Sequence, residues 1–165
     1  MASISTSSLQ YVKPAKYLGW AENDEQLQKF DNPNWTYSVK RNGHFCEVWR
    51  DGNQIVASTS GEPLTRISTV FTETQLAIPD GTMLTGELVV RDFNACTCPG
   101  QPHADYPGAT SHFKAHHPQA CAVVVFDVLY FKGLNVMQLP FSQRLTLATK
   151  IVNDANSKYL QMVER

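Results

Sequence analysis

The first part of the chain shows the alternation of apolar and polar residues that is typical of half-buried strands. Residues 35–39 alternate in this way, and 45–49 and 55–57 carry further β-branched and aromatic side chains. The Asn-Gly pair at 42–43 and the Asp-Gly-Asn run at 51–53 separate these segments and are typical of tight turns. The pattern predicts a meander of three antiparallel strands joined by two short hairpins.

Three other segments have helical features. Residues 67–76 place apolar side chains on one helical face, and Pro140 is positioned to open a longer helix that extends to about Ala155. The polar run at 23–26 can cap a short helix that ends before Pro33. The apolar faces are predicted to hold Leu27 and Phe30 in the short helix, and Leu145, Ala148, Ile151 and Val152 in the last one.

Two long apolar segments, Met83–Val90 and Cys121–Phe131, are bounded by turn residues and predict buried strands. Between them lies a loop of about thirty residues with no strong periodicity. The final segment, 159–163, alternates again; it is either an edge strand or part of a sheet whose remaining strands are missing, which would leave an unpaired apolar edge. Together, the segments predict an α+β domain of antiparallel sheet with helices packed outside.

Composition restricts the class of protein. A chain of 165 residues with 42% hydrophobic and 18% charged residues is typical of one globular domain, which excludes a disordered or fibrous protein. Fourteen basic and fifteen acidic residues argue against nucleic-acid binding over the whole surface but permit a local basic groove. The longest apolar run, 120–126, is too short to cross a bilayer, so no membrane association is expected.

The N-terminal segment 1–12 is serine-rich and predicts a flexible tail ahead of a domain at 13–165. It lacks the basic start and apolar stretch of a secretory signal. Two disulfides are possible, but without such a signal we expect reduced thiols in the cytoplasm or, in a eukaryote, the nucleus. The four cysteines are Cys46, Cys96, Cys98 and Cys121.

Three residues are candidates for chemistry. Lys40 lies just before a turn, and a lysine becomes nucleophilic when burial or a neighbouring cation such as Arg41 populates its neutral amine; the alternative is a solvated lysine. Glu87 lies within an apolar strand, where a carboxylate needs an ion pair or a metal, and Gly86 indicates close approach by a ligand or another backbone. Phe126 is either a core residue or a surface on which a purine stacks.

These candidates lie in three motifs that follow one another along the chain. The motifs are Lys-x-x-Gly at 40–43, Gly-Glu-Leu-Val at 86–89, and Phe-Asp-x-Leu-Tyr-x-x-Gly at 126–133, followed by Leu139-Pro140 and Arg144. Their order resembles the nucleotidyltransferase (adenylation) domain of ATP-dependent DNA ligases, over about residues 13–155. The segment Ser58–Pro63 resembles the Ser-Arg-x-Gly segment that lies between the first two motifs of that family.

The resemblance implies an ATP-grasp-like fold and covalent nucleotidyl transfer. In that family the motif lysine attacks the α-phosphate of ATP, pyrophosphate leaves, and the AMP passes to the 5′-phosphate of a nick that the 3′-hydroxyl then seals. Carried over by position, Lys40 is the nucleophile, Glu87 contacts the ribose or a metal, and Phe126 stacks on adenine. The implied cofactors are ATP and Mg²⁺, and the implied partner is nicked DNA in repair, replication or recombination.

The sequence departs from the family pattern at several positions. Asn42 replaces an aspartate, Phe45 and Thr59 replace arginines, Thr85 replaces an aspartate, and Ser38 replaces a glutamate. The later Glu-Gly-x-x-x-Lys and Lys-x-Lys motifs and the oligonucleotide-binding domain do not follow. The resemblance therefore implies a partial adenylation domain that does not seal nicks by itself, and a complementary C-terminal ligase fragment is a candidate partner.

Two other functions remain open. An RNA ligase or an RNA-capping guanylyltransferase uses the same lysine chemistry, although the run from 126 to 144 favours the DNA enzyme. A non-catalytic remnant or binding subunit is favoured by the replaced residues.

The loop over 92–119 is rich in potential metal ligands. It contains Cys96, Cys98, His103, His112, His116 and His117. Zinc sites usually combine a Cys-x₂₋₄-Cys pair with a regular second pair, and a Cys-x-Cys with scattered histidines fits that pattern poorly. We therefore expect a mobile, metal-free insertion, with a zinc site as the alternative.

Overall fold

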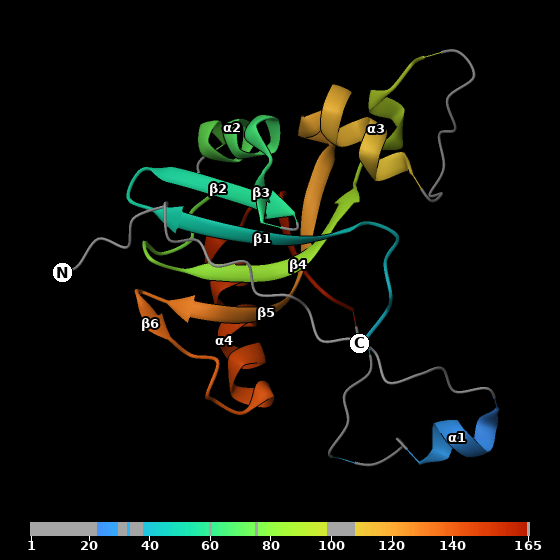
Figure 1. Ribbon diagram of the computed structural model, residues 1–165, viewed down its shortest axis with the longest axis vertical. Helices are drawn as coiled ribbons and strands as arrows, with labels where there is room; N and C mark the ends of the chain where they lie inside the picture. Colours follow the sequence, from blue (N-terminus) through green and yellow to red (C-terminus); the bar gives the residue numbers. More distant parts are fainter. Residues whose placement is uncertain are drawn as a thin grey trace.

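The computed structural model describes residues 23–29, 33, 38–59, 61–74, 76–98 and 108–164 (Figure 1). Within these residues, one mixed sheet has the strand order β3-β2-β1-β4-β5-β6, and β7 pairs with β5. Neighbouring strands are antiparallel, except that β7 runs parallel to β5. The strands are β1 His44–Asp51, β2 Gln54–Thr59, β3 Glu62–Pro63, β4 Met83–Val90, β5 Cys121–Phe131, β6 Leu134–Asn135 and β7 Leu160–Met162.

The helices α2, α3 and α4 pack against this sheet, which confirms the predicted α+β class. Figure 1 shows α2 beside β2 and β3, α4 behind β5, and α3 beyond the ends of β4 and β5. Phe71 of α2 meets Tyr159, which precedes β7, with ring centroids 5.6 Å apart. The helices are α1 Asp24–Gln28, α2 Thr65–Glu73, α3 Ala109–His116 and α4 Phe141–Ala155, with short 3-10 turns η2 Phe93–Ala95 and η3 Pro118–Ala120.

The two faces of the sheet have different environments. Side chains alternate across a strand, so Val48 of β1, Leu88 of β4 and Val125 of β5 join the core beneath α2 and α4. The intervening positions, such as Glu87 and Phe126, point to the opposite face. The site residues therefore lie on the face that α2 and α4 do not cover.

The first predicted strand is wrong over the residues that can be compared. Residues 38–41 are not in a strand, and 34–37 lie outside the described residues. The second neighbour of β1 is β4, and a Cβ added to Gly43 would lie 2.2 Å from the carbonyl oxygen of Leu88. Gly43 thus permits close packing against β4 rather than a hairpin turn, whereas the hairpin at Gly52, with φ of +57°, is confirmed.

Most of the longer predicted elements are confirmed. The strands β4 and β5 and the helices α2 and α4 lie where the periodicity placed them, and the predicted face of α4 is buried. Asn23 caps α1 by accepting a hydrogen bond from the Gln26 amide. Leu27 of this helix is 49% exposed, while Phe30 and the predicted tail at 1–12 lie outside the described residues.

One expectation about the connections is wrong. The stretch between β4 and β5 is not a structureless loop, because it contains η2, α3 and η3, and Phe113 of α3 is fully buried against Phe93. The segment 159–163 does form a strand: among the described residues β7 pairs with β5 on one side, as an edge strand does, and Leu160 is buried. In the described residues, each helix is too short or too polar to span a bilayer.

Candidate functional site

A cavity of about 200 Å³ lies on the face that α2 and α4 do not cover, where the segment before β1 meets β4 and β5. It is lined by Ser38, Val39, Lys40, Arg41, Glu87, Val124, Phe126 and Val163. The structure thus brings Lys40, Glu87 and Phe126 together, which confirms the prediction that the three motifs meet at one concave surface.

The segment that carries Lys40 is held by residues near the end of the described chain. The Val39 amide donates a hydrogen bond to the Glu164 carbonyl over 3.0 Å, and the Arg41 guanidinium lies 2.7 Å from the Glu164 carboxylate. The Val163 amide in turn donates to the Val125 carbonyl of β5 over 2.9 Å. Sequence reasoning missed Val163 and Glu164, since no local pattern indicates this pairing.

The environment of Lys40 differs from the one that the sequence suggested. Lys40 is exposed rather than partly buried. Arg41, the expected activating cation, is paired with Glu164. The structure therefore shows neither of the two activating features, burial and an unpaired Arg41, that the sequence suggested for Lys40.

Glu87 lies on β4 directly opposite Phe45 of β1 and is half-buried. Burial raises the pKa of its carboxyl above the usual range, while the charge of Lys40 and a hydrogen bond from the Gly43 backbone act in the opposite direction. Gly86 precedes it because a Cβ there would lie 2.4 Å from the Val124 carbonyl oxygen of β5. The predicted close approach is therefore made by another backbone.

Phe126 occupies the same face on β5, next to an irregularity in the β4–β5 register. Its ring lies 6.1 Å from the ring of Phe45, at an interplanar angle of 41°. Phe45 is the residue that replaces an arginine of the ligase motif. Phe126 thus lines the cavity and packs beside a second aromatic ring at the position where the family pattern has a cation.

A second cavity of about 340 Å³ adjoins the first and shares Arg41 and Val124 with it. Arg91 and Gln161 also line this cavity. The guanidinium of Arg91 lies 6.0 Å from the ring centroid of Tyr159. Lys40 and Arg91 thus add positive charge to the two adjoining cavities, whereas the charge of Arg41 is offset by its ion pair with Glu164.

A family model for the ATP dependent DNA ligase domain matches residues 16–165. The chain belongs to the ATP-dependent DNA ligase family. This result confirms the resemblance that the three motifs indicated, and it covers both the site and the sheet that carries it.

One solved structure supports the fold. The ligase domain is similar to a mycobacterial DNA ligase D complexed with ATP and MES, with a TM-score of 0.52 and 20% identity over 78% of this chain and 38% of that chain. It also matches structures named Pmar-Lig_Pre and Pmar-Lig_PreS3 at 13% and 15% identity, with TM-scores of 0.48 and 0.42, over 77% of this chain and 29% of each of those. No curated protein matches its sequence. The chain thus spans well under half the length of the ligases that it resembles.

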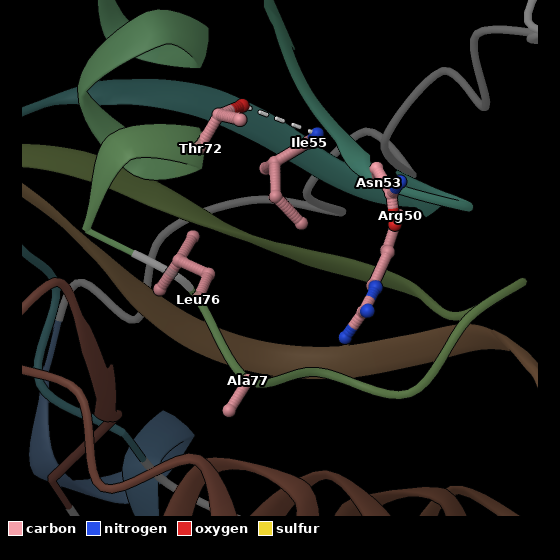
Figure 2. Close-up of a pocket in the computed structure, with 6 residues that line it drawn as sticks. All are labelled: Arg50, Asn53, Ile55, Thr72, Leu76 and Ala77. Atoms are coloured by element: carbon pink, nitrogen blue, oxygen red, sulfur yellow. Dashed lines mark hydrogen bonds between the residues drawn. The ribbon is translucent and has the colours of Figure 1, made fainter.

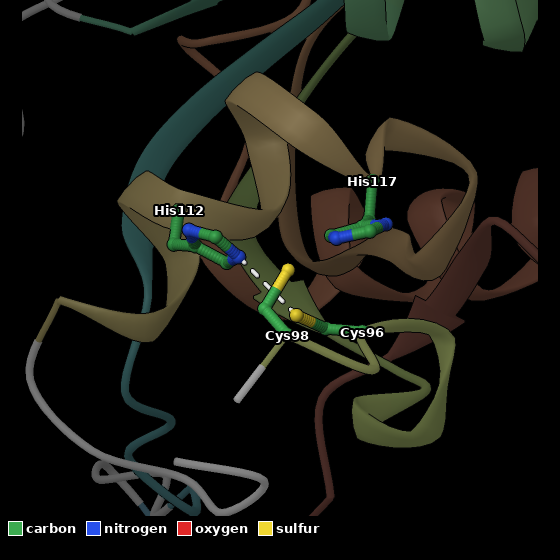
Figure 3. A group of neighbouring side chains, drawn as sticks. All are labelled: Cys96, Cys98, His112 and His117. Atoms are coloured by element: carbon green, nitrogen blue, oxygen red, sulfur yellow. Dashed lines mark hydrogen bonds between the residues drawn. The ribbon is translucent and has the colours of Figure 1, made fainter. Parts of the chain in front are cut away.

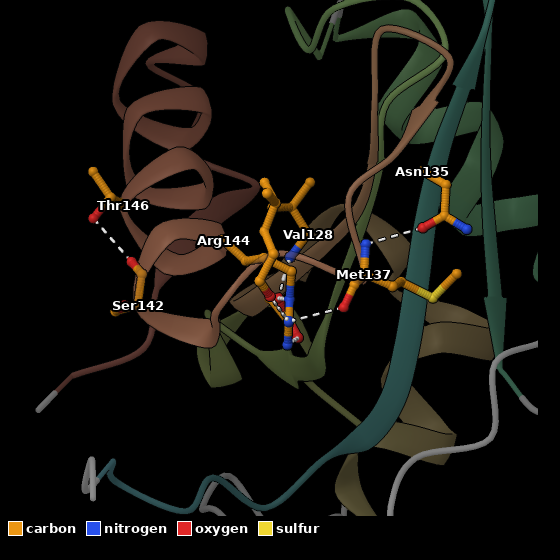
Figure 4. Close-up of polar contacts among 8 residues, drawn as sticks. Val128, Asn135, Met137, Ser142, Arg144 and Thr146 are labelled. Atoms are coloured by element: carbon orange, nitrogen blue, oxygen red, sulfur yellow. Dashed lines mark hydrogen bonds and ion pairs between the residues drawn. The ribbon is translucent and has the colours of Figure 1, made fainter. Parts of the chain in front are cut away.

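The most specific part of the ligase motif has a structural explanation. Arg144 of α4 donates from Nε and Nη2 to the two carboxylate oxygens of Asp127, the residue after Phe126, each over 2.9 Å. Its Nη1 also donates to the carbonyl of Met137, as Figure 4 shows, and to that of Leu139. Hydrogen bonding to Asp127 raises the pKa of Arg144. The Phe-Asp and Arg parts of the motif therefore join α4 to the strand that presents Phe126.

A larger cavity of about 430 Å³ lies at the opposite end of β1 and is not part of this site (Figure 2). Arg50 lines it, but the guanidinium already donates to the carbonyls of Gly52 and Ile78. Thr72 of α2 similarly accepts a hydrogen bond from the Ile55 amide. The polar groups of this cavity thus connect the β1–β2 hairpin to neighbouring segments.

His44 connects the ligase site to α3 and gives the stability a pH dependence. Lys114 Nζ lies 3.1 Å from its Nδ1, and Ser111 Oγ lies 3.4 Å from its Nε2. Burial, and secondly the charge of Lys114, lower the pKa of His44 below 6.5. The unfolded chain then binds the proton more tightly, so this contribution to stability is complete above pH 6.5 and is lost as the pH falls through the folded-state pKa.

We therefore expect the Tm of the wild type to fall more than that of His44→Gln when the pH is lowered from about 7.5 to about 5.5. Thermal melts followed by circular dichroism at the two pH values measure this difference. Titrations elsewhere in the molecule are common to both proteins and cancel. An equal fall in both proteins would contradict the role of His44.

Proposed function

We propose that this domain charges itself with AMP from ATP, with Lys40 as the nucleophile. The observation that carries this proposal is the single cavity that Lys40 shares with Glu87 and Phe126. A nucleophile, a hard anionic ligand and an aromatic surface are the groups that covalent nucleotidyl transfer requires. Membership in the ATP-dependent DNA ligase family supports the same reaction.

In the proposed reaction the neutral Lys40 amine attacks the α-phosphorus of ATP. A P–N bond forms, the bond from the α-phosphorus to the bridging oxygen of pyrophosphate breaks, and the amine proton passes to solvent. Such in-line displacement depends mainly on positioning and on neutralisation of charge. The exposure of Lys40 suits this role, since the triphosphate must approach it from solvent.

The other lining residues fit parts of the nucleotide. A cavity of about 200 Å³ is smaller than the roughly 300–1,000 Å³ of most ligand sites, so it takes the base and ribose, while the phosphates extend past Lys40 and Arg41. Phe126 stacks on the adenine, and Ser38 supplies a polar contact to it. The similar mycobacterial ligase D was solved with ATP, which is in keeping with this assignment.

Glu87 is the acidic residue among the eight that line the cavity, and a carboxylate is a hard oxygen ligand of the kind that Mg²⁺ prefers. Mg²⁺ typically takes one or two protein carboxylates together with substrate phosphates, and when bound it would neutralise charge on those phosphates. Glu87 is therefore assigned to hold the metal or the ribose hydroxyls. Its raised pKa means that this role requires a higher pH than an ordinary glutamate would.

Sealing of nicked DNA in repair, replication or recombination is proposed for a ligase in which this adenylation domain acts together with further parts. The adjoining cavity offers the Arg91 guanidinium to a 5′-phosphate, and Arg41, which pairs with Glu164, lies beside it. The cytoplasm, or the nucleus of a eukaryote, contains ATP and DNA and keeps thiols reduced. It is therefore the proposed location of this domain. A complementary ligase fragment is the partner that would supply the remaining steps.

A binding domain without catalysis is the second candidate. It is favoured by Phe45, whose ring packs toward Phe126 where the family pattern places an arginine. Such a domain would bind ATP in the same cavity and form no covalent adduct. An RNA ligase or a capping guanylyltransferase differs instead in the end or the nucleotide that it uses.

The test is labelling with α-labelled ATP or GTP in the presence of Mg²⁺. We expect an acid-labile adduct from ATP that is lost in Lys40→Ala and retained in Lys150→Ala, a control lysine on the exposed face of α4. Phe126→Ala is expected to raise the ATP concentration for half-maximal labelling about 5–150-fold, because base stacking contributes about 1–3 kcal/mol, while Phe126→Tyr retains it.

Each other outcome rejects part of the assignment. Label that survives in Lys40→Ala rejects the nucleophile, and a preference for GTP favours the capping enzyme. ATP binding by calorimetry without label, in a protein whose Phe126→Ala variant binds more weakly, favours the binding domain.

A further inference from the structure

Four metal-ligating side chains meet where the chain leaves β4 and where α3 begins and ends. One ligand atom from each of Cys96, Cys98, His112 and His117 lies within 4.8 Å of the other three. Figure 3 shows the two thiols between the two imidazole rings, with the Cys96 Sγ 3.4 Å from the His112 Nε2. None of these four residues lines the Lys40 cavity.

Backbone hydrogen bonds fix three of the four ligand residues. The Cys96 amide donates to the Phe93 carbonyl at the end of η2, and the His112 amide donates to the carbonyl of the residue before α3. The His117 amide donates to the Phe113 carbonyl over 2.7 Å at the end of the same helix. These ligands are therefore preorganised by regular structure, as a metal site requires.

The cluster rests on an apolar base and opens to solvent. Phe93 and Phe113 pack edge to face with centroids 5.7 Å apart, and Phe113 is 1% exposed. Cys96 is also 1% exposed and forms the floor, while the two histidines are half-buried and Cys98 is exposed. An ion can thus enter from solvent and be enclosed by the four side chains.

We propose that these side chains form a structural zinc site with two thiolates and two imidazoles as ligands. Thiolate and imidazole are the ligands that Zn²⁺ favours, and four protein ligands leave no open position for catalysis. A tetrahedron with Zn–S of about 2.3 Å and Zn–N of about 2.0–2.1 Å has edges of about 3.3–3.8 Å. The 3.4 Å contact already fits, and the exposed Cys98 can rotate to close the longer separations.

Zinc binding at this place is an acid–base step, not a redox step. Two Zn–S bonds and two Zn–N bonds form, and the two thiol protons are released to solvent. Because the cluster contains sulfur and nitrogen but no carboxylate, it does not suit the Mg²⁺ that the ligase reaction uses. The proposal is therefore independent of the proposed function.

The zinc would tie α3 to the end of β4. Residues 99–107, which lie outside the described residues, join Cys98 to the start of α3, and a metal bridge would close this stretch into a loop. Lys114 and Ser111 of α3 contact His44 at the start of β1. The site therefore supports the helix that borders the segment leading to Lys40.

His116 provides a matched control. It is exposed, on the same helix as His112, and its ring centroid is 4.9 Å from that of His112. It is nevertheless not one of the four grouped ligands. If the geometry is right, His116→Ala retains the metal and His117→Ala does not.

The experiment uses the untagged full chain, kept reduced, with the variants Cys98→Ser, His117→Ala and His116→Ala. Elemental analysis after desalting is expected to give one zinc per chain for the wild type and His116→Ala, and a loss of zinc in the other two. After removal of the zinc, Co²⁺ should give the visible spectrum of a tetrahedral site and a thiolate charge-transfer band. We expect Cys98→Ser to weaken Co²⁺ binding at least about 100-fold, since even groups that merely orient a ligand contribute about 10–100-fold.

Far-UV circular dichroism shows whether each variant is folded, and all three substituted positions are at least partly exposed. In the wild type, Zn²⁺ should also protect Cys96 and Cys98 from alkylation, as mapped by peptide mass, which requires no variant. Substoichiometric zinc after reconstitution, alkylation of these two thiols that Zn²⁺ does not slow, or equal zinc in His117→Ala and the wild type would each overturn the proposal.

Discussion

Gly86→Ala is expected to lower the free energy of unfolding by about 3 kcal/mol or more, at the upper end of the cost of overpacking. The added Cβ would lie 2.4 Å from the Val124 carbonyl oxygen and 2.7 Å from a Val123 methyl group. A backbone oxygen within a paired strand cannot rotate away, so β4 and β5 must separate. For a chain of this size, the Tm should fall by about 6–12 °C.

Gly52 is the matched control for this substitution. It lies in the exposed β1–β2 turn, and nothing lies within 4 Å of an added Cβ. Its φ of +57° is a conformation that asparagine adopts readily, so Gly52→Asn should cost under about 1 kcal/mol. Chemical denaturation of both variants gives the comparison. If Gly86→Ala is as mild as the control, β4 and β5 are not as closely apposed as described.

Arg144→Ala is expected to cost about 3 kcal/mol, because removal of one partner of a largely buried pair leaves the other charge uncompensated. The side chains of Arg144 and Asp127 are only 17% and 15% exposed. The variant also loses the hydrogen bonds to the Met137 and Leu139 carbonyls. Arg144→Lys should recover little of the loss, since an ammonium group cannot form the two-point contact.

The ion pair of Lys150 and Asp154 is the matched control on the same helix. Its side chains are 69% and 64% exposed, and such i,i+4 pairs contribute about 0.3–0.5 kcal/mol. Lys150→Ala should therefore leave the Tm almost unchanged, whereas Arg144→Ala lowers it by about 6–12 °C. A Tm for Arg144→Ala close to that of Lys150→Ala would show that α4 is held by its apolar face alone.

These two substitutions also bear on the site, because Gly86 precedes Glu87 and Asp127 follows Phe126. The residues that the motifs share with the ligase family thus include positions whose role is to hold strands and a helix together. From sequence alone, Gly86 indicated that another group approaches closely, but not which group. Arg144 supported the family resemblance, but the residue that it contacts could not be predicted. The structure identifies the partners as the backbone of β5 and the Asp127 carboxylate.

The sequence by itself determined the elements whose burial follows a local period. The strands β4 and β5 and the helices α2 and α4 could be predicted from the spacing of apolar residues, because the residues that each element buries follow one another at a regular spacing in the sequence. The order of three motifs also brought Lys40, Glu87 and Phe126 into one hypothesis, because each motif has a recognisable local form.

Only the tertiary structure decided contacts between segments that are distant in sequence. A glycine beside a turn and a glycine beside a neighbouring strand look alike locally, so Gly43 could not be interpreted without β4. Likewise, no local pattern shows that Glu164 pairs with Arg41 or that β7 pairs with β5. The side chains of Cys96 and His117 come together because α3 folds and packs Phe113 into the core. The spacing of the cysteines and histidines in the sequence does not indicate this packing.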